Sequence, residues 1–131
     1  MDRKTLNYIY NYLPVITSVS SKAKKNNAAL IISNVREFFE ILQKQIPLKK
    51  IPNISEINSD AHGCITLLWE LDIDEKMFYD YFLLTFPGYK IVKFKGKVES
   101  LQMETQGYCD LDNIFKTDII EYLSFFKGKQ K

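Results

Sequence analysis

The chain has 131 residues, of which 46% are hydrophobic and 26% are charged, and its formal net charge is +2 at pH 7. This length and composition predict a single globular domain that buries a core without disulfides, and they exclude global disorder. A net charge this small excludes recognition of a polyanion by overall charge alone. Any nucleic-acid site would have to come from the local distribution of the lysines.

The sequence has no segment with the properties of a signal peptide or a membrane span. The N-terminal residues Met1–Thr5 are largely charged or polar, and no apolar run of sufficient length follows them. Cys64 and Cys109 have no close-spaced partner, so reduced thiols are expected. We therefore expect a cytoplasmic protein that makes no contact with a membrane.

The N-terminal part, to about residue 47, is predicted to be helical. Leu6–Leu13 place apolar residues at helical spacing, and Pro14 is expected to end this first helix. A longer helix is predicted over Asn27–Gln45, where apolar residues recur at steps of three and four, and Ile46-Pro47 is expected to stop it. Between the two helices, the polar segment Thr17–Asn27 predicts a surface loop.

The stretch His62–Leu71 surrounds the only tryptophan of the chain. Apolar residues alternate from Ile65 to Leu71, which predicts a strand with one face in the core. Trp69 is expected to be a buried structural residue, and Gly63 is expected to form the turn into the strand. The preceding segment Leu48–Asp60 is predicted to be an extended connector.

Three further strand-like runs are predicted at Met77–Phe86, Tyr89–Lys95 and Lys97–Thr105, separated by Pro87-Gly88 and Gly96. Together with the Trp69 strand, these runs predict an antiparallel meander of four strands. A polar turn is expected over residues 106–113.

Apolar residues between Ile114 and Phe126 predict a C-terminal helix over about residues 112–126, with a break near Lys116 and a cap at Asp112 or Thr117. The expected architecture is a two-layer α+β domain over residues 1–131, with a helical part at about 1–47 and a sheet at about 62–105. The helices are expected to pack on one face of the four-stranded antiparallel sheet.

The central strand and its surroundings resemble a loose group of small, mostly uncharacterised bacterial proteins that carry the pattern Asp-x-x-Gly-x-Ile-x-Leu-x-Trp. The matching residues are Ile51-Pro52, Ile54, Asp60, Gly63, Ile65, Leu67, Trp69-Glu70 and Phe115–Leu123. This chain departs from the pattern at His62, Cys64 and Leu68, where glycine or acidic residues are more usual in the group. The resemblance implies a partner-binding role, as in toxin–antitoxin or mobile-element accessory proteins, and it supplies no catalytic residue.

Catalytic or metal chemistry is not predicted from the residues. His62 is the only histidine, and a grouping with Asp60 and Cys64 lacks the paired, close-spaced ligands of structural zinc sites, with Cys109 as the sole other thiol. The acidic segment Asp72–Glu75 is interpreted as a charged loop between strands. We therefore expect a non-enzymatic protein with no cofactor and no metal.

The aromatic residues of the predicted sheet indicate a protein-binding surface, with Tyr79, Tyr81 and Tyr89 as the tentative contact residues. The expected partner is another protein, such as a toxin or a defence component. The chain itself is expected to be a bacterial or phage antitoxin, immunity or defence-related accessory protein.

An alternative is a nucleic-acid-binding module. Lys93, Lys95 and Lys97 recur at every second residue across the two predicted strands that meet at Gly96, and they could share one face with Tyr89 and Tyr108 nearby. Such a surface can contact phosphates and stack bases of a single strand. The same lysines could instead protect an edge strand from aggregation, and the oligomeric state is left open.

Overall fold

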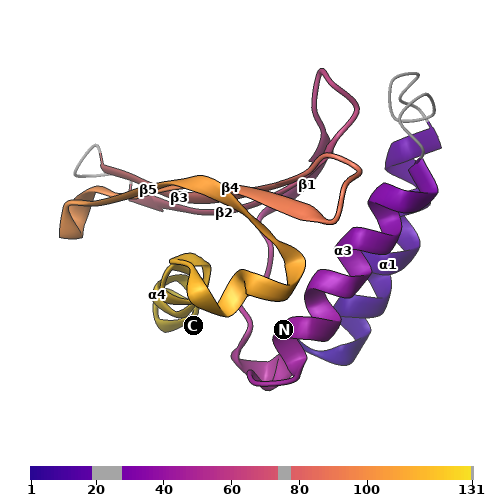
Figure 1. The fold of residues 1–131 in the computed structure, drawn as a ribbon. Helices are drawn as coiled ribbons and strands as arrows, with labels where there is room; N and C mark the ends of the chain where they lie inside the picture. Colours follow the sequence, from indigo (N-terminus) through magenta and orange to yellow (C-terminus); the bar gives the residue numbers. More distant parts are fainter. Residues whose placement is uncertain (19–27, 74–77, 131) are drawn as a thin grey trace.

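The computed structural model describes residues 1–18, 28–73 and 78–130, which form an α+β fold around one antiparallel sheet (Figure 1). The strands follow the order β1-β2-β3-β4-β5. In chain order, the elements are α1 (Arg3–Ser18), α3 (Ala28–Gln43), η1 (Leu48–Lys50), β1 (Glu56–Ser59), β2 (Ile65–Ile73), β3 (Phe78–Phe86), β4 (Ile91–Val98), η2 (Glu99–Leu101), β5 (Met103–Asp110), η3 (Leu111–Lys116) and α4 (Ile119–Lys129), where η marks a short 3₁₀ turn.

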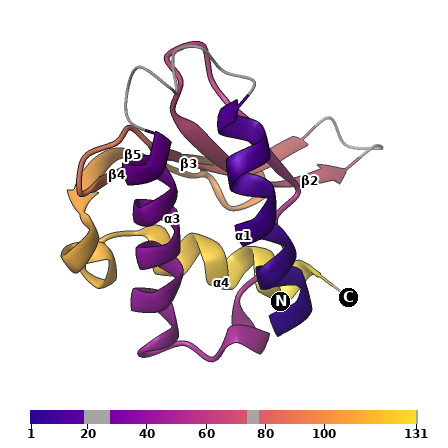
Figure 2. The ribbon, with the colours of Figure 1, turned by 90° about the vertical axis from the view of Figure 1, so that its right-hand side faces the viewer.

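The helices do not form a single layer parallel to the sheet. α4 runs beneath the sheet, whereas α1 and α3 lie side by side at one end of it (Figure 1). The view from that end shows α1 and α3 running across the direction of α4 (Figure 2). Phe38 of α3 contacts Phe86 at the end of β3, with ring centroids 5.5 Å apart. The α1–α3 pair therefore covers the end of the sheet, and α4 covers its middle.

The sheet has five strands, so the expectation of four was wrong. The additional strand β1 comes from the segment that was predicted to be an extended connector, and Ile57 lies opposite Leu67 of β2. The hairpin is closed by Asp60, whose N–H donates to the carbonyl of Cys64 at 2.9 Å, and by Gly63, whose φ is 81°. Asp60 Oδ1 also accepts the N–H groups of His62 and Cys64 at 2.9 and 3.0 Å. This tight turn folds the connector back onto β2.

Gly96 lies inside β4, although the sequence pattern predicted a break there. The break occurs instead at η2, where Gln102 adopts a left-handed φ of 53°. A Cβ atom on Gly96 would lie 2.6 Å from Cδ1 of Phe82 and 2.9 Å from Cε1 of Tyr122. Glycine is therefore needed for close packing of α4 on the sheet. As a consequence, β5 covers most of the residues that were predicted to form a polar turn.

α1 continues through Pro14, where the first helix was expected to end. Proline removes one backbone donor from the helix, but Ile16 and Thr17 beyond it are both buried, and the Thr17 hydroxyl donates to the Leu13 carbonyl at 3.1 Å. Burial of this last turn offsets the lost hydrogen bond. Most of the predicted loop, residues 19–27, and residues 74 and 75 of the predicted charged loop lie outside the described residues. Asp72 and Ile73, the first two residues of that predicted loop, instead belong to β2.

The core lies between the covered face of the sheet and the helices. Trp69 has no exposed surface, and its Nε1–H donates to the carbonyl of Pro52 at 3.1 Å. Its ring lies next to Phe82, which in turn stacks on Tyr122 of α4. The predicted C-terminal helix is split into η3 and α4, and the Ile119 N–H donates to the Thr117 hydroxyl just after the break at 3.2 Å. The break near the end of η3 is as predicted.

We predict that Gly96→Ala destabilises the fold by about 1–3 kcal/mol, because the added methyl group forces Phe82 and Tyr122 apart. Gly128→Ala is the matched control, since a Cβ atom there meets nothing within 4 Å and alanine favours a helix. Urea denaturation of both variants measures the difference. Equal stabilities of the two variants would contradict the packing role of Gly96.

Candidate functional site

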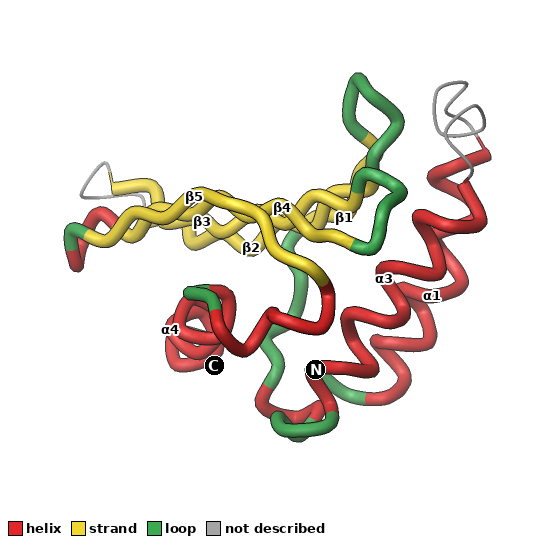
Figure 3. Tube along the Cα trace, viewed as in Figure 1, coloured by secondary structure: helices red, strands yellow, loops and turns green. Residues whose placement is uncertain are grey.

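The sheet has one face that no described element covers, and we call it the open face (Figure 3). Ile65, Leu67 and Trp69 of β2 are buried toward the helices, while the residues between them are only partly buried on the opposite side. The strand register extends this alternation across the sheet. The open face carries Thr66, Leu68, Glu70, Tyr79, Tyr81, Leu83, Thr85, Lys93, Lys95, Lys97, Glu104, Gln106 and Tyr108.

Tyr79 and Tyr81 form a stacked pair on the open face, with ring centroids 5.3 Å apart and an interplanar angle of 23°. The Tyr79 hydroxyl donates to Oε2 of Glu70 at 2.6 Å, and its backbone N–H donates to Oε2 of Glu99 at 3.2 Å. Burial and the hydrogen bond to Glu70 raise the pKa of Tyr79 to about 12. Tyr79 is therefore a protonated donor held in one orientation, although 46% of its surface is exposed.

Tyr89 does not belong to this group. It lies in the turn between β3 and β4 and is 69% exposed. Its carbonyl accepts a hydrogen bond from the side-chain amide of Asn34 in α3. From Tyr79 to Phe86, at the end of β3, the strand spans roughly 24 Å, so Tyr89 lies far along the sheet from the stacked pair. Of the three predicted contact residues, the structure brings only Tyr79 and Tyr81 together.

The three predicted lysines are brought together on the open face. In β4, Lys93 lies opposite Thr85 and Tyr108, Lys95 opposite Leu83 and Gln106, and Lys97 opposite Tyr81 and Glu104. The ammonium group of Lys97 is 3.4 Å from Oε1 of Glu99 and forms an ion pair. β4 lies between β3 and β5, so the explanation that these lysines protect an edge strand was wrong.

The lysines have acidic and aliphatic neighbours that were not predicted from the sequence. Glu70 and Glu104 lie in the same row of the sheet as Lys97, on either side of it, and Leu68 and Leu83 lie in the row of Lys95. A shallow hollow of about 210 Å³ is lined by Leu83, Thr85, Lys93, Phe94, Lys95, Gln106 and Gly107. The alternation of side chains between the two faces of β3 could have placed Leu83 on the open face from the sequence alone. The acidic neighbours depend on strand register, which no local pattern reveals.

Of the residues considered for catalysis or metal binding, Asp60, His62 and Cys64 lie together in one turn, and Cys109 lies in a different element. His62 and Cys64 lie in the β1–β2 turn, whereas Cys109 lies in β5, and both thiols are unpaired. Burial raises the pKa of both thiols, which keeps them protonated and weakens them as nucleophiles. Among the described residues, no group of three or more His, Cys, Asp or Glu side chains is placed to hold a metal ion.

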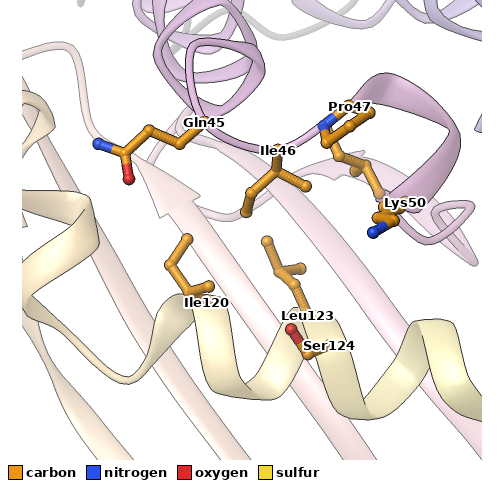
Figure 4. A pocket seen from close by; sticks show the side chains of 8 residues that line it. Gln45, Ile46, Pro47, Lys50, Ile120, Leu123 and Ser124 are labelled. Carbon is orange, nitrogen blue, oxygen red and sulfur yellow. The ribbon is translucent and has the colours of Figure 1, made fainter.

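A second hollow, of about 270 Å³, lies on the helical side of the molecule (Figure 4). It separates α4 from the segment that follows α3, and Ile46 faces Ile120 and Leu123 across it (Figure 4). Its lining consists of Gln45, Ile46, Pro47, Lys50, Ile51, Ile120, Leu123 and Ser124. This hollow is mainly aliphatic and shares no residue with the open face.

Comparisons of the chain with protein-family models, with curated proteins and with solved structures found no match. Within the described ranges, none of the helices has the length and apolar character that a membrane crossing requires.

We predict that Glu70→Gln lowers the pKa of Tyr79 from about 12 toward its ordinary value of 10, because the substitution removes the adjacent negative charge. Because the pKa of Tyr79 is higher in the folded state than in the unfolded chain, the protonated hydroxyl of Tyr79 contributes to the stability of the fold. This contribution is fully present below about pH 10 and is lost as the pH rises toward 12. NMR titration of the tyrosine Cζ signals measures the shift. Glu104→Gln is the control, and the interpretation fails if both variants leave the titration of Tyr79 unchanged.

Proposed function

We propose that the protein is a non-enzymatic protein-binding module and that the open face of the sheet is its contact surface. The observation that carries the proposal is the stacked Tyr79–Tyr81 pair, held by Glu70 and Glu99, on a face that no described element covers. Pre-ordered aromatic rings contribute large contact area at low entropic cost and are typical anchors of protein interfaces. Leu68 and Leu83 extend this apolar surface next to Tyr81.

The charges of the open face favour a protein partner over a polyanion. Lys93 and Lys95 form a basic region, but Glu70, Glu99 and Glu104 surround Lys97 at the other end of β4. A phosphate backbone placed along the strand would meet these carboxylates, which costs electrostatic energy. A protein surface can carry acidic groups opposite the lysines and basic groups opposite the glutamates. Mixed charge therefore supports recognition of a folded protein with the complementary pattern.

We further propose that the partner is a toxin or another defence component and that this chain is a cytoplasmic antitoxin, immunity or defence-related accessory protein of a bacterium or phage. This part rests on the resemblance of the Asp60–Trp69 segment to small accessory proteins. The contact residues that we assign are Tyr79, Tyr81 and Leu83, with Tyr108, which is 73% exposed, at the side of the surface. Tyr89 is left out of the contact because it lies at the far end of β3.

The test is a charge placed in the middle of the open face. We expect Leu83→Lys to weaken partner binding by about 30-fold or more, because it buries an unpaired ammonium group at the interface. The partner is first identified by pull-down from native lysate and then purified for calorimetry. Leu30→Lys, at a 38% exposed position on α3, is the matched control. Equal binding by both variants would show that the contact lies elsewhere on the molecule.

A second candidate is a single-stranded nucleic-acid site, which the position of Lys93 next to Tyr108 favours. We expect such binding to be no tighter than about micromolar at physiological salt, because the acidic residues oppose it. Fluorescence anisotropy with a labelled oligonucleotide measures the affinity and its dependence on salt.

The control for that measurement is the triple substitution of Lys93, Lys95 and Lys97 by Gln. For a genuine phosphate site, the slope of log affinity against log salt flattens by roughly 0.7 per lysine removed. Submicromolar, salt-steep binding that the triple substitution abolishes would make the nucleic-acid function the better account. Binding that is weak in both proteins supports the protein-binding function.

A further inference from the structure

The two edges of the sheet differ in length and protection. β1 has four residues, whereas β5 has eight. β5 is the last strand in the order β1-β2-β3-β4-β5, so no strand of the described residues pairs with its outer edge. Its principal neighbours in the described part of the chain are β4 and the adjoining turns η2 and η3. β5 is therefore a long edge strand with an uncovered outer side.

β5 also lacks the features by which monomeric proteins prevent edge-to-edge pairing. Its sequence, METQGYCD, has no proline and no lysine. Its register with β4 runs from Met103 opposite Val98 to Asp110 opposite Ile91 without a bulge. Edge strands of monomers are usually short, bulged, charged with lysine or covered. β5 has none of these protections, apart from its terminal carboxylates.

The outward hydrogen-bonding groups of β5 can be identified from the ladder. The Leu111 N–H donates to the Lys90 carbonyl at 3.1 Å, directly beyond the last pair of the two strands. In an antiparallel ladder, hydrogen-bonded pairs alternate with pairs that are not hydrogen-bonded. Counting back from Leu111, every second residue of β5 is therefore hydrogen-bonded to β4. The N–H and C=O groups of Glu104, Gln106 and Tyr108 consequently point away from β4. These groups are available to another strand.

We propose that a second copy of this chain adds its β5 antiparallel to this edge, with the two-fold axis passing through Gln106. Gln106 then faces Gln106 of the second copy, and Glu104 faces Tyr108 of the second copy on both sides of the axis. A two-fold axis makes these contacts reciprocal. On the helical side, Thr105 faces Gly107 of the second copy, and the Phe94 ring of each chain occupies the space that a Cβ atom on its own Gly107 would take.

The competing registers are less favourable. Moving the axis to Gly107 places Glu104 directly opposite Asp110 of the second copy, and like charges in that position are destabilising. Moving it to Thr105 shortens the overlap, because Gln102 adopts a left-handed φ of 53° and ends the strand. The register centred on Gln106 avoids both problems. It also joins the two open faces into one continuous surface, so this inference goes beyond the proposed partner binding and does not depend on it.

The proposal is tested by disulfide trapping at the axis, in protein whose native thiols are removed by Cys64→Ser and Cys109→Ser. We expect Gln106→Cys to form a disulfide-linked dimer under mild oxidation, because opposed residues of an antiparallel pair lie within disulfide reach. Glu104→Cys is the matched control. It does not link to itself, because the two copies of Glu104 are offset along the strands, but it links to Tyr108→Cys when the two proteins are mixed. Equal self-linking of Gln106→Cys and Glu104→Cys would overturn this register.

A second measurement does not rely on added thiols. Sedimentation of the unsubstituted protein should give the mass of a dimer, and Gln106→Pro should give a monomer, because its N–H points outward and is not needed for pairing with β4. Circular dichroism verifies that the proline variant is folded. An unsubstituted protein that sediments as a monomer at every concentration overturns the proposal. Loss of partner binding in Leu83→Lys without loss of the dimer separates this inference from the proposed function.

Discussion

The contact between Tyr122 and Phe82 across Gly96 determines how the two layers of this protein meet. The rings are stacked with centroids 5.0 Å apart, and any side chain at Gly96 would occupy the space that they use. The contact places α4 directly beneath the middle strands, so the apolar face of the sheet, including Trp69, is removed from water. Because α4 packs on this side, no helix of the described residues covers the opposite face of the sheet.

The stacked tyrosine pair of the open face is held in a fixed position although it is partly exposed to solvent. Tyr79 forms hydrogen bonds with Glu70 and Glu99, and Glu99 forms an ion pair with Lys97. This polar network holds the aromatic pair in place before a partner binds. On the covered side of β3, buried Asp80 accepts the N–H of Glu99 at 2.9 Å and supports the same turn. A surface that is already ordered loses little conformational entropy when another molecule binds to it.

Residues of the proposed surface were partly evident before the fold was known. The lysines at 93, 95 and 97 follow the two-residue period of a strand, and Tyr79 and Tyr81 follow it in the neighbouring strand. Their relation to Glu104 and Tyr108 was not evident, because it depends on how β4 pairs with β5. Tyr89 was grouped with the other tyrosines by sequence proximity, but a turn places it beyond the end of the strand.

The sequence by itself determined the elements whose pattern is local, namely the helix over Ala28–Gln43, the strand around Trp69 and the split C-terminal helix. Residues a few positions apart decide the period of such an element. Tertiary structure alone decided that β1 joins the sheet, that Gly96 continues a strand instead of ending one, and that α1 passes through Pro14. Each of these outcomes depends on burial against residues that are distant in the chain, and packing energy from such contacts outweighs the local preference of a glycine, a proline or a polar connector.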